Sequence, residues 1–97
     1  MENLLPHLQN KLTNELINTY INLDEHTYNL LLNSILNMIN KVTQGAKLTV
    51  DNIVHEFTES YIIIRCKDDV LATTESLAIY IDIKNNIIVS AEVSILL

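Results

Sequence analysis

Hydrophobic residues recur at helical spacing through the first half of the chain. One stripe consists of Leu5, Leu8, Leu12 and Leu16. Because residues three and four apart share a helix face, this stripe predicts a first helix beginning at about Pro6. The core face of a second helix consists of Tyr28, Leu31, Leu32, Ile35, Met38, Ile39 and Val42. That helix is predicted from about Glu25 to Thr43, with Asn22 as its cap and Gly45 just beyond its end.

The next apolar positions are also spaced like those of a helix. Thr49 is a suitable capping residue for the segment that follows it. The inward positions would be Val50, Ile53, Val54 and Phe57. This spacing predicts a short third helix over residues 49–57.

After Ser60 the hydrophobic period falls to that of a strand. Three runs alternate, and their apolar positions are Ile62, Ile64 and Cys66, then Leu77, Ile79, Ile81 and Ile83, then Val89, Ala91, Val93 and Ile95. We therefore expect one α+β domain over residues 1–97, made of a helical half (1–57) and a β-meander half (58–97). Two long N-terminal helices and a short third helix would pack on one face of a three-stranded antiparallel β-meander, against the second of these runs.

The register of the last hairpin should be the one that keeps its apolar residues together on one face of the sheet. A plain two-residue turn at Asn85-Asn86 would pair apolar with polar residues and mix the two faces of the sheet. A shift of one residue gives the pairs Ile83–Val89, Ile81–Ala91, Ile79–Val93 and Leu77–Ile95. We therefore expect a three-residue connection, or a two-residue turn followed by a bulge.

Asparagines form a polar stripe on each long helix. The stripes are Asn10, Asn14, Asn18 and Asn22, and then Asn29, Asn33, Asn37 and Asn40. The codon usage of an AT-rich genome is a sufficient explanation for them. On the first helix, however, the stripe borders two isoleucines that lie away from the leucines and would be spare apolar surface. Together with the apolar edge of the final strand, a face of Asn14, Ile17, Asn18 and Ile21 favours a homo-oligomer, most simply a dimer.

The chain is acidic, with 12 Asp and Glu against 6 Lys and Arg and a net charge of −6. This balance argues against direct binding of nucleic acid, because neutralising phosphates requires clustered basic side chains. It is compatible with a basic protein partner, and also with plain solubility. The single cysteine suits a reducing compartment, and neither a secretory signal nor a membrane-spanning run is evident, so we expect a cytoplasmic protein.

Candidate catalytic and metal-binding residues are sparse. His55-Glu56 followed by Glu59 resembles part of a zinc-binding helix, but Glu59 stands where the second histidine is needed. Asp51, His55 and Glu59 are more simply a solvated helical stripe. Cys66 lies among the apolar positions of its strand, as a buried small hydrophobic residue would.

Other groups that could carry chemistry have no partners at a useful spacing. His7 and His26 are isolated, and Gly45 alone cannot make a phosphate loop. Asp68-Asp69 and Glu75 lack the ligand spacing of a calcium loop. We therefore expect no metal, no cofactor and no catalysis.

Two surfaces are candidates for binding a partner. The open sheet face would present Tyr61, Arg65, Lys67, Tyr80, Asp82 and Glu92. An acidic cluster would consist of Asp51, Glu56, Glu59, Asp68, Asp69 and Glu75. Our hypothesis is a small acidic protein-binding module that occludes a basic surface, as an inhibitor, antitoxin, immunity protein or phage host-takeover factor would. The alternatives are a structural homo-oligomeric subunit and a DNA mimic that inhibits a DNA-binding protein.

Overall fold

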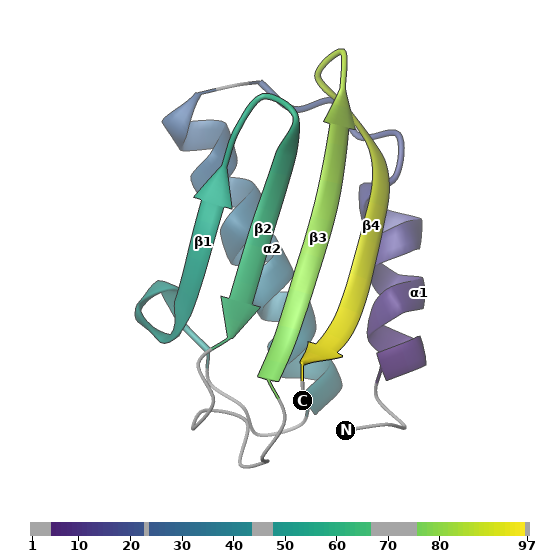
Figure 1. Cartoon of the computed structure of the whole chain (residues 1–97), viewed down its shortest axis with the longest axis vertical. Coiled ribbons are helices and arrows are strands. Elements are labelled where there is room, and N and C mark those ends of the chain that lie inside the picture. Colours follow the sequence, from purple (N-terminus) through teal and green to yellow (C-terminus); the bar gives the residue numbers. More distant parts are fainter. Residues whose placement is uncertain (1–4, 23, 44–47, 67–75, 97) are drawn as a thin grey trace.

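A computed structural model describes residues 5–22, 24–43, 48–66 and 76–96 of the chain. Two helices come first, α1 (Leu5–Leu16) and α2 (Glu25–Thr43), followed by a short 3-10 turn, η1 (Val50–Asn52). The strands are β1 (Ile53–Phe57), β2 (Tyr61–Cys66), β3 (Ser76–Lys84) and β4 (Ile87–Leu96). They form one antiparallel sheet in the order β1-β2-β3-β4 (Figure 1).

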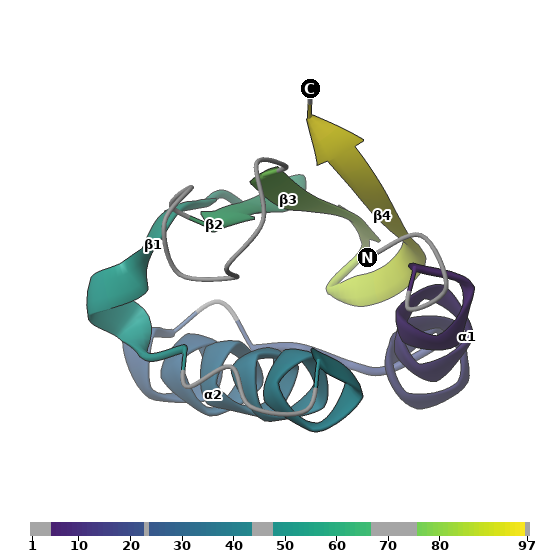
Figure 2. The same cartoon turned by 90° about the horizontal axis from the view of Figure 1, so that it is seen from below.

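The two helices lie on one side of the sheet, which makes a two-layer α+β fold (Figure 2). Helix α2 runs behind β1, β2 and β3, whereas α1 lies beside β4 at the edge of the sheet (Figures 1 and 2). The other face of the sheet carries no helix among the described residues. The expected placement of both helices on one face is therefore confirmed.

The core lies between α2, α1 and the inner face of the sheet. Its sheet residues include Ile62, Ile64, Leu77, Ile79, Ile81 and Ile83, all of them buried. The predicted core positions of α2 are confirmed, and Leu36 is buried as well. Full burial of an isoleucine or leucine side chain stabilises the fold by about 1.5–3 kcal/mol, so this aliphatic layer is the main stabilising contribution.

The predicted third helix is wrong, because its second half is the strand β1. Only Val50–Asn52 forms a helical turn, in which the Thr49 N–H donates to Asn52 Oδ1 at 2.9 Å. Ile53 and Phe57, four residues apart, lie on one face in either a helix or a strand, so their spacing does not distinguish the two. Val54 does distinguish them, since it is 61% exposed in the strand. The sheet therefore has four strands instead of the three that the sequence predicts.

The hairpin between β3 and β4 uses a two-residue turn followed by a bulge, one of the two predicted connections. Asn85 and Asn86 have φ angles of 53° and 62°, which asparagine tolerates and which the right-handed twist of a hairpin favours. The predicted pairs Ile81–Ala91, Ile79–Val93 and Leu77–Ile95 are confirmed. The pair Ile83–Val89 is wrong, since Ile83 pairs with Ile88 and the register shifts at Asp82/Ile83. The bulge keeps the apolar pairs beyond it on one face.

Helix α1 ends earlier than its asparagine stripe suggests. It stops at Leu16, and Asn18 adopts a φ of 68°, a conformation that cannot continue the helix. The chain then runs along β4, where Tyr20 forms an isolated antiparallel bridge with Ile87. Ile21 consequently turns into the core and is 2% exposed, so the expectation that it is spare apolar surface is wrong.

The N-terminus of α2 is capped by Asp24, whereas the sequence predicts Asn22. Asp24 Oδ1 accepts the Thr27 N–H at 2.8 Å, and Oδ2 accepts the Thr27 hydroxyl at 3.0 Å. The bond from the Thr27 N–H is the main reason that the pKa of Asp24 lies below its ordinary value. The predicted bounds of α2 are confirmed.

Candidate functional site

The outer face of the sheet carries rows of side chains that the register aligns across the strands. One row joins Glu56, Ile63, Tyr80 and Glu92, in strand order from β1 to β4. It therefore has a carboxylate at each end and a branched and an aromatic side chain between them. Ile63 and Tyr80 are half-buried, while Glu56 and Glu92 are exposed.

Hydrogen bonds tie the neighbouring row to this one. Tyr61 pairs with Asp82, which pairs with Ser90, and the Ser90 hydroxyl donates to Asp82 Oδ2 at 2.9 Å. Tyr61 hydrogen-bonds the Glu56 carboxylate, and this bond is the largest cause of the raised pKa of the Tyr61 hydroxyl. Polar contacts within the face thus fix the orientation of side chains that remain accessible to a partner.

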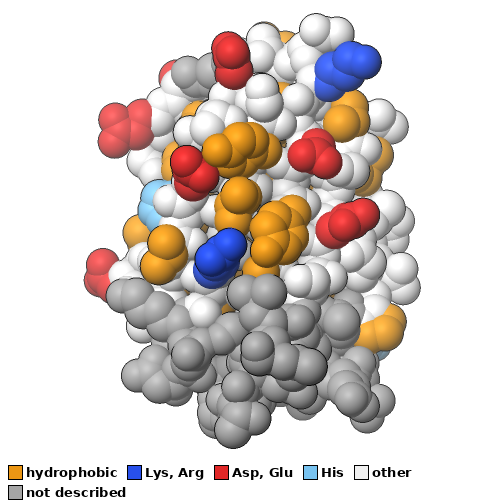
Figure 3. All heavy atoms as spheres, in the orientation of Figure 1, with side chains coloured by type: hydrophobic (Ala, Val, Ile, Leu, Met, Phe, Trp, Pro, Cys, Tyr) orange, Lys and Arg blue, Asp and Glu red, His pale blue; other side chains and the backbone are white. Residues whose placement is uncertain are grey.

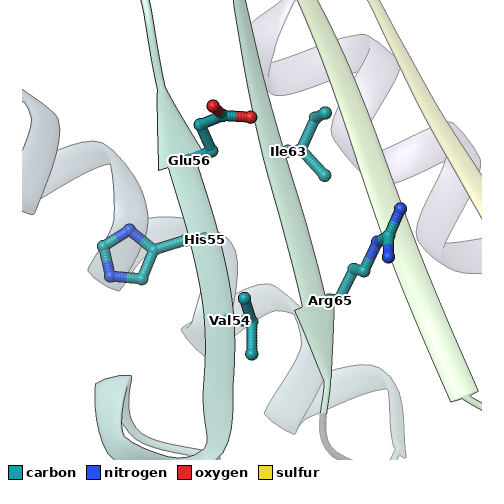
Figure 4. A pocket seen from close by; sticks show the side chains of 5 residues that line it. All are labelled: Val54, His55, Glu56, Ile63 and Arg65. Carbon is teal, nitrogen blue, oxygen red and sulfur yellow. The ribbon is translucent and has the colours of Figure 1, made fainter.

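A shallow hollow of about 260 Å³ lies over β1 and β2. Its lining residues are Val54, His55, Glu56, Ile63 and Arg65 (Figure 4). The Arg65 guanidinium extends toward β3, while the imidazole of His55 lies on the far side of β1 (Figure 4). The hollow thus has an exposed valine, Val54, beside the carboxylate of Glu56.

The outer face has hydrophobic side chains in the middle, a basic side chain directly beside them, and acidic side chains around them, with a second basic side chain farther out (Figure 3). The predicted partner-binding residues described by the structure all lie on this face, namely Tyr61, Arg65, Tyr80, Asp82 and Glu92. Lys67 lies outside the described residues. Their role in binding stays a prediction.

The predicted acidic cluster spreads over three elements. Asp51 lies in η1, Glu56 on β1, and Glu59 in the connection between β1 and β2. Because this segment is no helix, the stripe of Asp51, His55 and Glu59 expected from helical spacing does not form. Asp68, Asp69 and Glu75 lie outside the described residues. Among the residues that the structure describes, no group of three His, Cys, Asp or Glu side chains could hold a metal ion.

The predicted oligomer face is only partly at the surface. Asn14 and Asn18 are exposed, but Ile17 packs against the core and Ile21 is buried. Nearby, a groove of about 290 Å³ between α1, α2 and the linker includes the exposed Leu30. Ile21 lines this groove, but the exposed apolar side chains there, Tyr20 and Leu30, are ones that the sequence analysis did not single out.

The edge of the sheet at β4 is covered by side-chain and main-chain hydrogen bonds. Gln9 Nε2 donates to the Ala91 carbonyl at 2.7 Å, and Gln9 Oε1 accepts the Val93 N–H at 2.8 Å. The side-chain amide of α1 thus takes the place of a peptide group in a neighbouring strand. No sequence pattern marks Gln9, since its partners lie more than 80 residues away.

The linker after α1 extends this cover toward the hairpin. The Asn18 N–H donates to the Ile88 carbonyl at 2.8 Å, and the Ile88 N–H donates to the Thr19 carbonyl at 2.9 Å. The Ile21 N–H donates to the Asn86 carbonyl at 2.7 Å. The final strand was expected to invite pairing unless something covered it, and α1 and the linker do so over these positions.

The edge of the sheet at β1 has a different environment. The bond from the Thr58 N–H to the Tyr61 carbonyl (2.9 Å) makes Thr58 and Tyr61 a hydrogen-bonded pair. Along an antiparallel ladder, hydrogen-bonded pairs alternate with pairs that are not hydrogen-bonded. Glu56 and Val54 therefore bond β2, whereas His55 and Phe57 turn their backbone groups outward. Among the described residues, no strand pairs with this outer edge.

Aromatic packing holds the inner side of β1 against α2. The rings of Tyr28 and Phe57 stack with centroids 4.3 Å apart and an interplanar angle of 5°. The Tyr28 hydroxyl hydrogen-bonds His55 Nδ1 at 2.5 Å, and burial raises the pKa of this hydroxyl. Contacts with α2 thus hold β1 on the inner side of the sheet, while the backbone groups of His55 and Phe57 point away from β2.

The lone cysteine lies on the inner side of β2, where burial raises the pKa of the Cys66 thiol to about 11. The thiol is therefore protonated at neutral pH, the less nucleophilic form. This agrees with the interpretation of Cys66 as a core residue.

A comparison of the chain with protein-family models, curated proteins and solved structures finds no match. Within the described part of the chain, neither helix has the length and apolar character needed to cross a membrane. The class of the protein therefore follows from the fold alone. It is a small two-layer α+β domain with a four-stranded antiparallel meander, open on one face.

Proposed function

We propose that this protein is a non-catalytic binding module that docks the outer face of its sheet onto a basic surface of another protein. The observation that carries the proposal is the row in which Ile63 and Tyr80 lie between Glu56 and Glu92. An apolar centre with a charged rim is the usual anatomy of a protein interface. The net charge of −6 adds long-range attraction toward a basic partner.

The two parts of this surface would contribute differently to binding. Tyr80 and Ile63 supply area that loses water in the complex, and aromatic side chains are common among the residues that dominate binding energy. Glu56 and Glu92 would select a partner with Lys or Arg at matching positions and speed association at low salt. We propose that binding occludes the partner's basic surface, so that the module acts in the cytoplasm as an inhibitor of the antitoxin, immunity or phage host-takeover type.

The proposal is tested by affinity capture from the native cells with two double variants of identical composition. The first carries Tyr80→Ala and Glu92→Gln on the outer face, and the second carries Tyr20→Ala and Glu15→Gln beside the groove between the helices. We expect the second variant and the parent to retain the same partner, and the first to lose it. Capture should also weaken as salt rises.

The opposite outcome would contradict the proposal. If the variant with Tyr20→Ala and Glu15→Gln loses the partner and the outer-face variant keeps it, binding occurs at the groove between α1 and α2. Circular dichroism of both variants checks that each is folded, since all four substituted side chains lie outside the fully buried core.

A further inference from the structure

The sheet has two edges, and among the described residues hydrogen bonds from outside the sheet cover only the β4 edge, at several of its peptide groups. At β4, the side chain of Gln9 and the backbone of residues 18–19 bond outward-facing peptide groups, and the Ile21 N–H bonds the Asn86 carbonyl in the adjoining turn. At β1, the alternation fixed by the Thr58–Tyr61 pair turns the N–H and C=O groups of His55 and Phe57 away from β2. These groups form a template on which another extended chain can continue the sheet.

The surroundings of this edge fit an added strand. Val54 and Glu56 lie on the outer face of the edge strand β1, two residues apart, and line the hollow over β1 and β2. On the inner side, the stack of Tyr28 on Phe57 holds β1 in place, so the edge is ordered before anything binds. A pre-ordered edge lowers the entropy cost of binding, because only the incoming chain must become extended.

We propose that β1 binds an extended segment of the partner protein as a fifth strand of the sheet. The proposal rests on the proposed function in that the partner is a protein, and it adds the mode of binding and the sequence pattern recognised. Side chains two residues apart on the added strand would lie beside Val54 and Glu56. The segment therefore carries an apolar residue and a Lys or Arg on one face, with a single residue between them.

Charge favours a basic segment over a second copy of this chain as the occupant. Glu56 lies on β1 itself and Glu59 follows in its connection to β2, whereas β1 carries no Lys or Arg. The nearby Arg65 pairs with Val54 from β2, and its guanidinium extends toward β3, away from the β1 edge (Figure 4). A second copy would bring the same carboxylates and another net charge of −6 to the interface. A segment with Lys or Arg would neutralise Glu56 where it lies beside the added strand.

The test uses the peptide Lys-Thr-Val-Thr-Lys, acetylated and amidated, with the full-length protein labelled for NMR. Its sequence is symmetric, so either strand direction places Val beside Val54 and one Lys beside Glu56. In antiparallel pairing, which continues the pattern of this sheet, the threonines then turn their backbone groups toward β1. At peptide concentrations ten times the dissociation constant, we expect amide hydrogen exchange at His55 and Phe57 to slow by about tenfold.

Two control peptides separate backbone pairing from charge. The same peptide with both threonines N-methylated loses the N–H groups that face β1, and we expect no protection with it. The peptide Glu-Thr-Val-Thr-Glu keeps the backbone and reverses the charge, and we expect binding at least tenfold weaker. Equal binding by either control peptide would overturn the proposed recognition.

Two variants at one position provide the matched test in the protein. His55→Pro removes the outward N–H and leaves the bonds from Val54 and Glu56 to β2 in place. His55→Ala keeps the N–H and, like the proline variant, lacks the bond to Tyr28. We expect His55→Ala to bind the peptide as the parent does, and His55→Pro to bind at least tenfold more weakly. If the proline variant fails to fold, the exchange measurement on the parent protein decides.

The remaining outcomes distinguish this inference from the proposed function. If the peptide leaves exchange at His55 and Phe57 unchanged, the inference fails, and the capture experiment with Tyr80→Ala and Glu92→Gln still tests the outer face independently. If these amides become protected without peptide as the protein concentration rises, the occupant is a second copy and the inference is overturned.

Discussion

The two outer strands of the sheet, β4 and β1, solve the problem of unpaired backbone groups in different ways. Beside β4 lie a helix, a linker and the amide of Gln9, which together bond several of its outward-facing peptide groups. Beside β1, the described residues supply packing from α2 on one side but no partner for the edge itself. A protein that needed only to avoid aggregation would benefit from covering both edges, so the difference directs attention to β1 as the edge available for binding.

The largest expected effect comes from loosening α1, which would make the β4 edge resemble the β1 edge. Leu12, on the core-facing side of this helix, is fully buried, and Leu12→Ala is expected to lower the free energy of unfolding by about 2–5 kcal/mol. Urea denaturation measures this loss. The exposed β4 edge should also promote aggregation, which light scattering would detect. Loss of stability below about 1 kcal/mol would show that α1 packs less tightly than the structure indicates.

Removal of the Gln9 amide should open the β4 edge without disturbing the core. Gln9→Ala leaves the Ala91 carbonyl and the Val93 N–H without this partner, and an unmade bond at such a site costs about 1–3 kcal/mol. Hydrogen exchange at the Val93 amide should become faster. Asn10→Ala, a change to an exposed neighbour on the same helix, serves as the control and should alter neither quantity.

A smaller effect is expected when the hydrogen bond behind β1 is removed but the aromatic stack remains. Tyr28→Phe deletes the hydroxyl that bonds His55 and keeps the ring on Phe57. The expected loss of stability is about 0.5–1.5 kcal/mol. The Phe57 amide should exchange faster if this bond steadies β1. Unchanged exchange and stability would assign the ordering of β1 to the ring stack alone.

The smallest expected effect is a pH dependence of the free energy of unfolding that arises from Cys66, beside the first residue of β1. Cys66 pairs with Ile53, and its thiol has a pKa of about 11 instead of the ordinary 9.0. The native state therefore holds the proton more tightly than the unfolded state does. This contribution to stability is complete below pH 9 and is lost as the pH rises through about 11.

Replacement of the thiol should make this decline shallower. We expect the free energy of unfolding of Cys66→Ala to fall less steeply than that of the parent across the alkaline range, as measured by urea denaturation. Equal slopes would show that the tyrosines, with raised pKa values of their own at Tyr28 and Tyr61, account for the whole decline. Iodoacetamide labelling of Cys66 at neutral pH should likewise be slow and should accelerate in variants that loosen β1.

The comparison of the two edges also shows what the sequence could reveal. The helix α2 and the pairing of β3 with β4 were predictable, because long periodic patterns leave few alternatives. The segment 49–57 was not, since Ile53 and Phe57 satisfy both a helix and a strand. Its β-branched residues and the following Thr58–Ser60 turn were the signals that favoured a strand.

The residues that bond distant backbone were beyond prediction for a different reason. Asn40, part of the asparagine stripe predicted on the second helix, bonds the N–H and the carbonyl of Leu48, at 2.8 and 3.1 Å. Gln9 bonds β4 in the same manner. A local pattern shows which face of a helix an amide occupies, but it does not show which peptide group will lie opposite. The outer sheet face, by contrast, followed directly from alternation.

The amide of Gln9 also has an evolutionary consequence. Because one side chain supplies two of the bonds at the β4 edge, a single substitution in a descendant could expose that edge while the core and the hairpin register stay intact. The domain could then acquire a second strand-pairing surface, or a new symmetric assembly, in one mutational step. Protection by a side chain is thus easier to gain and to lose than protection by an additional strand.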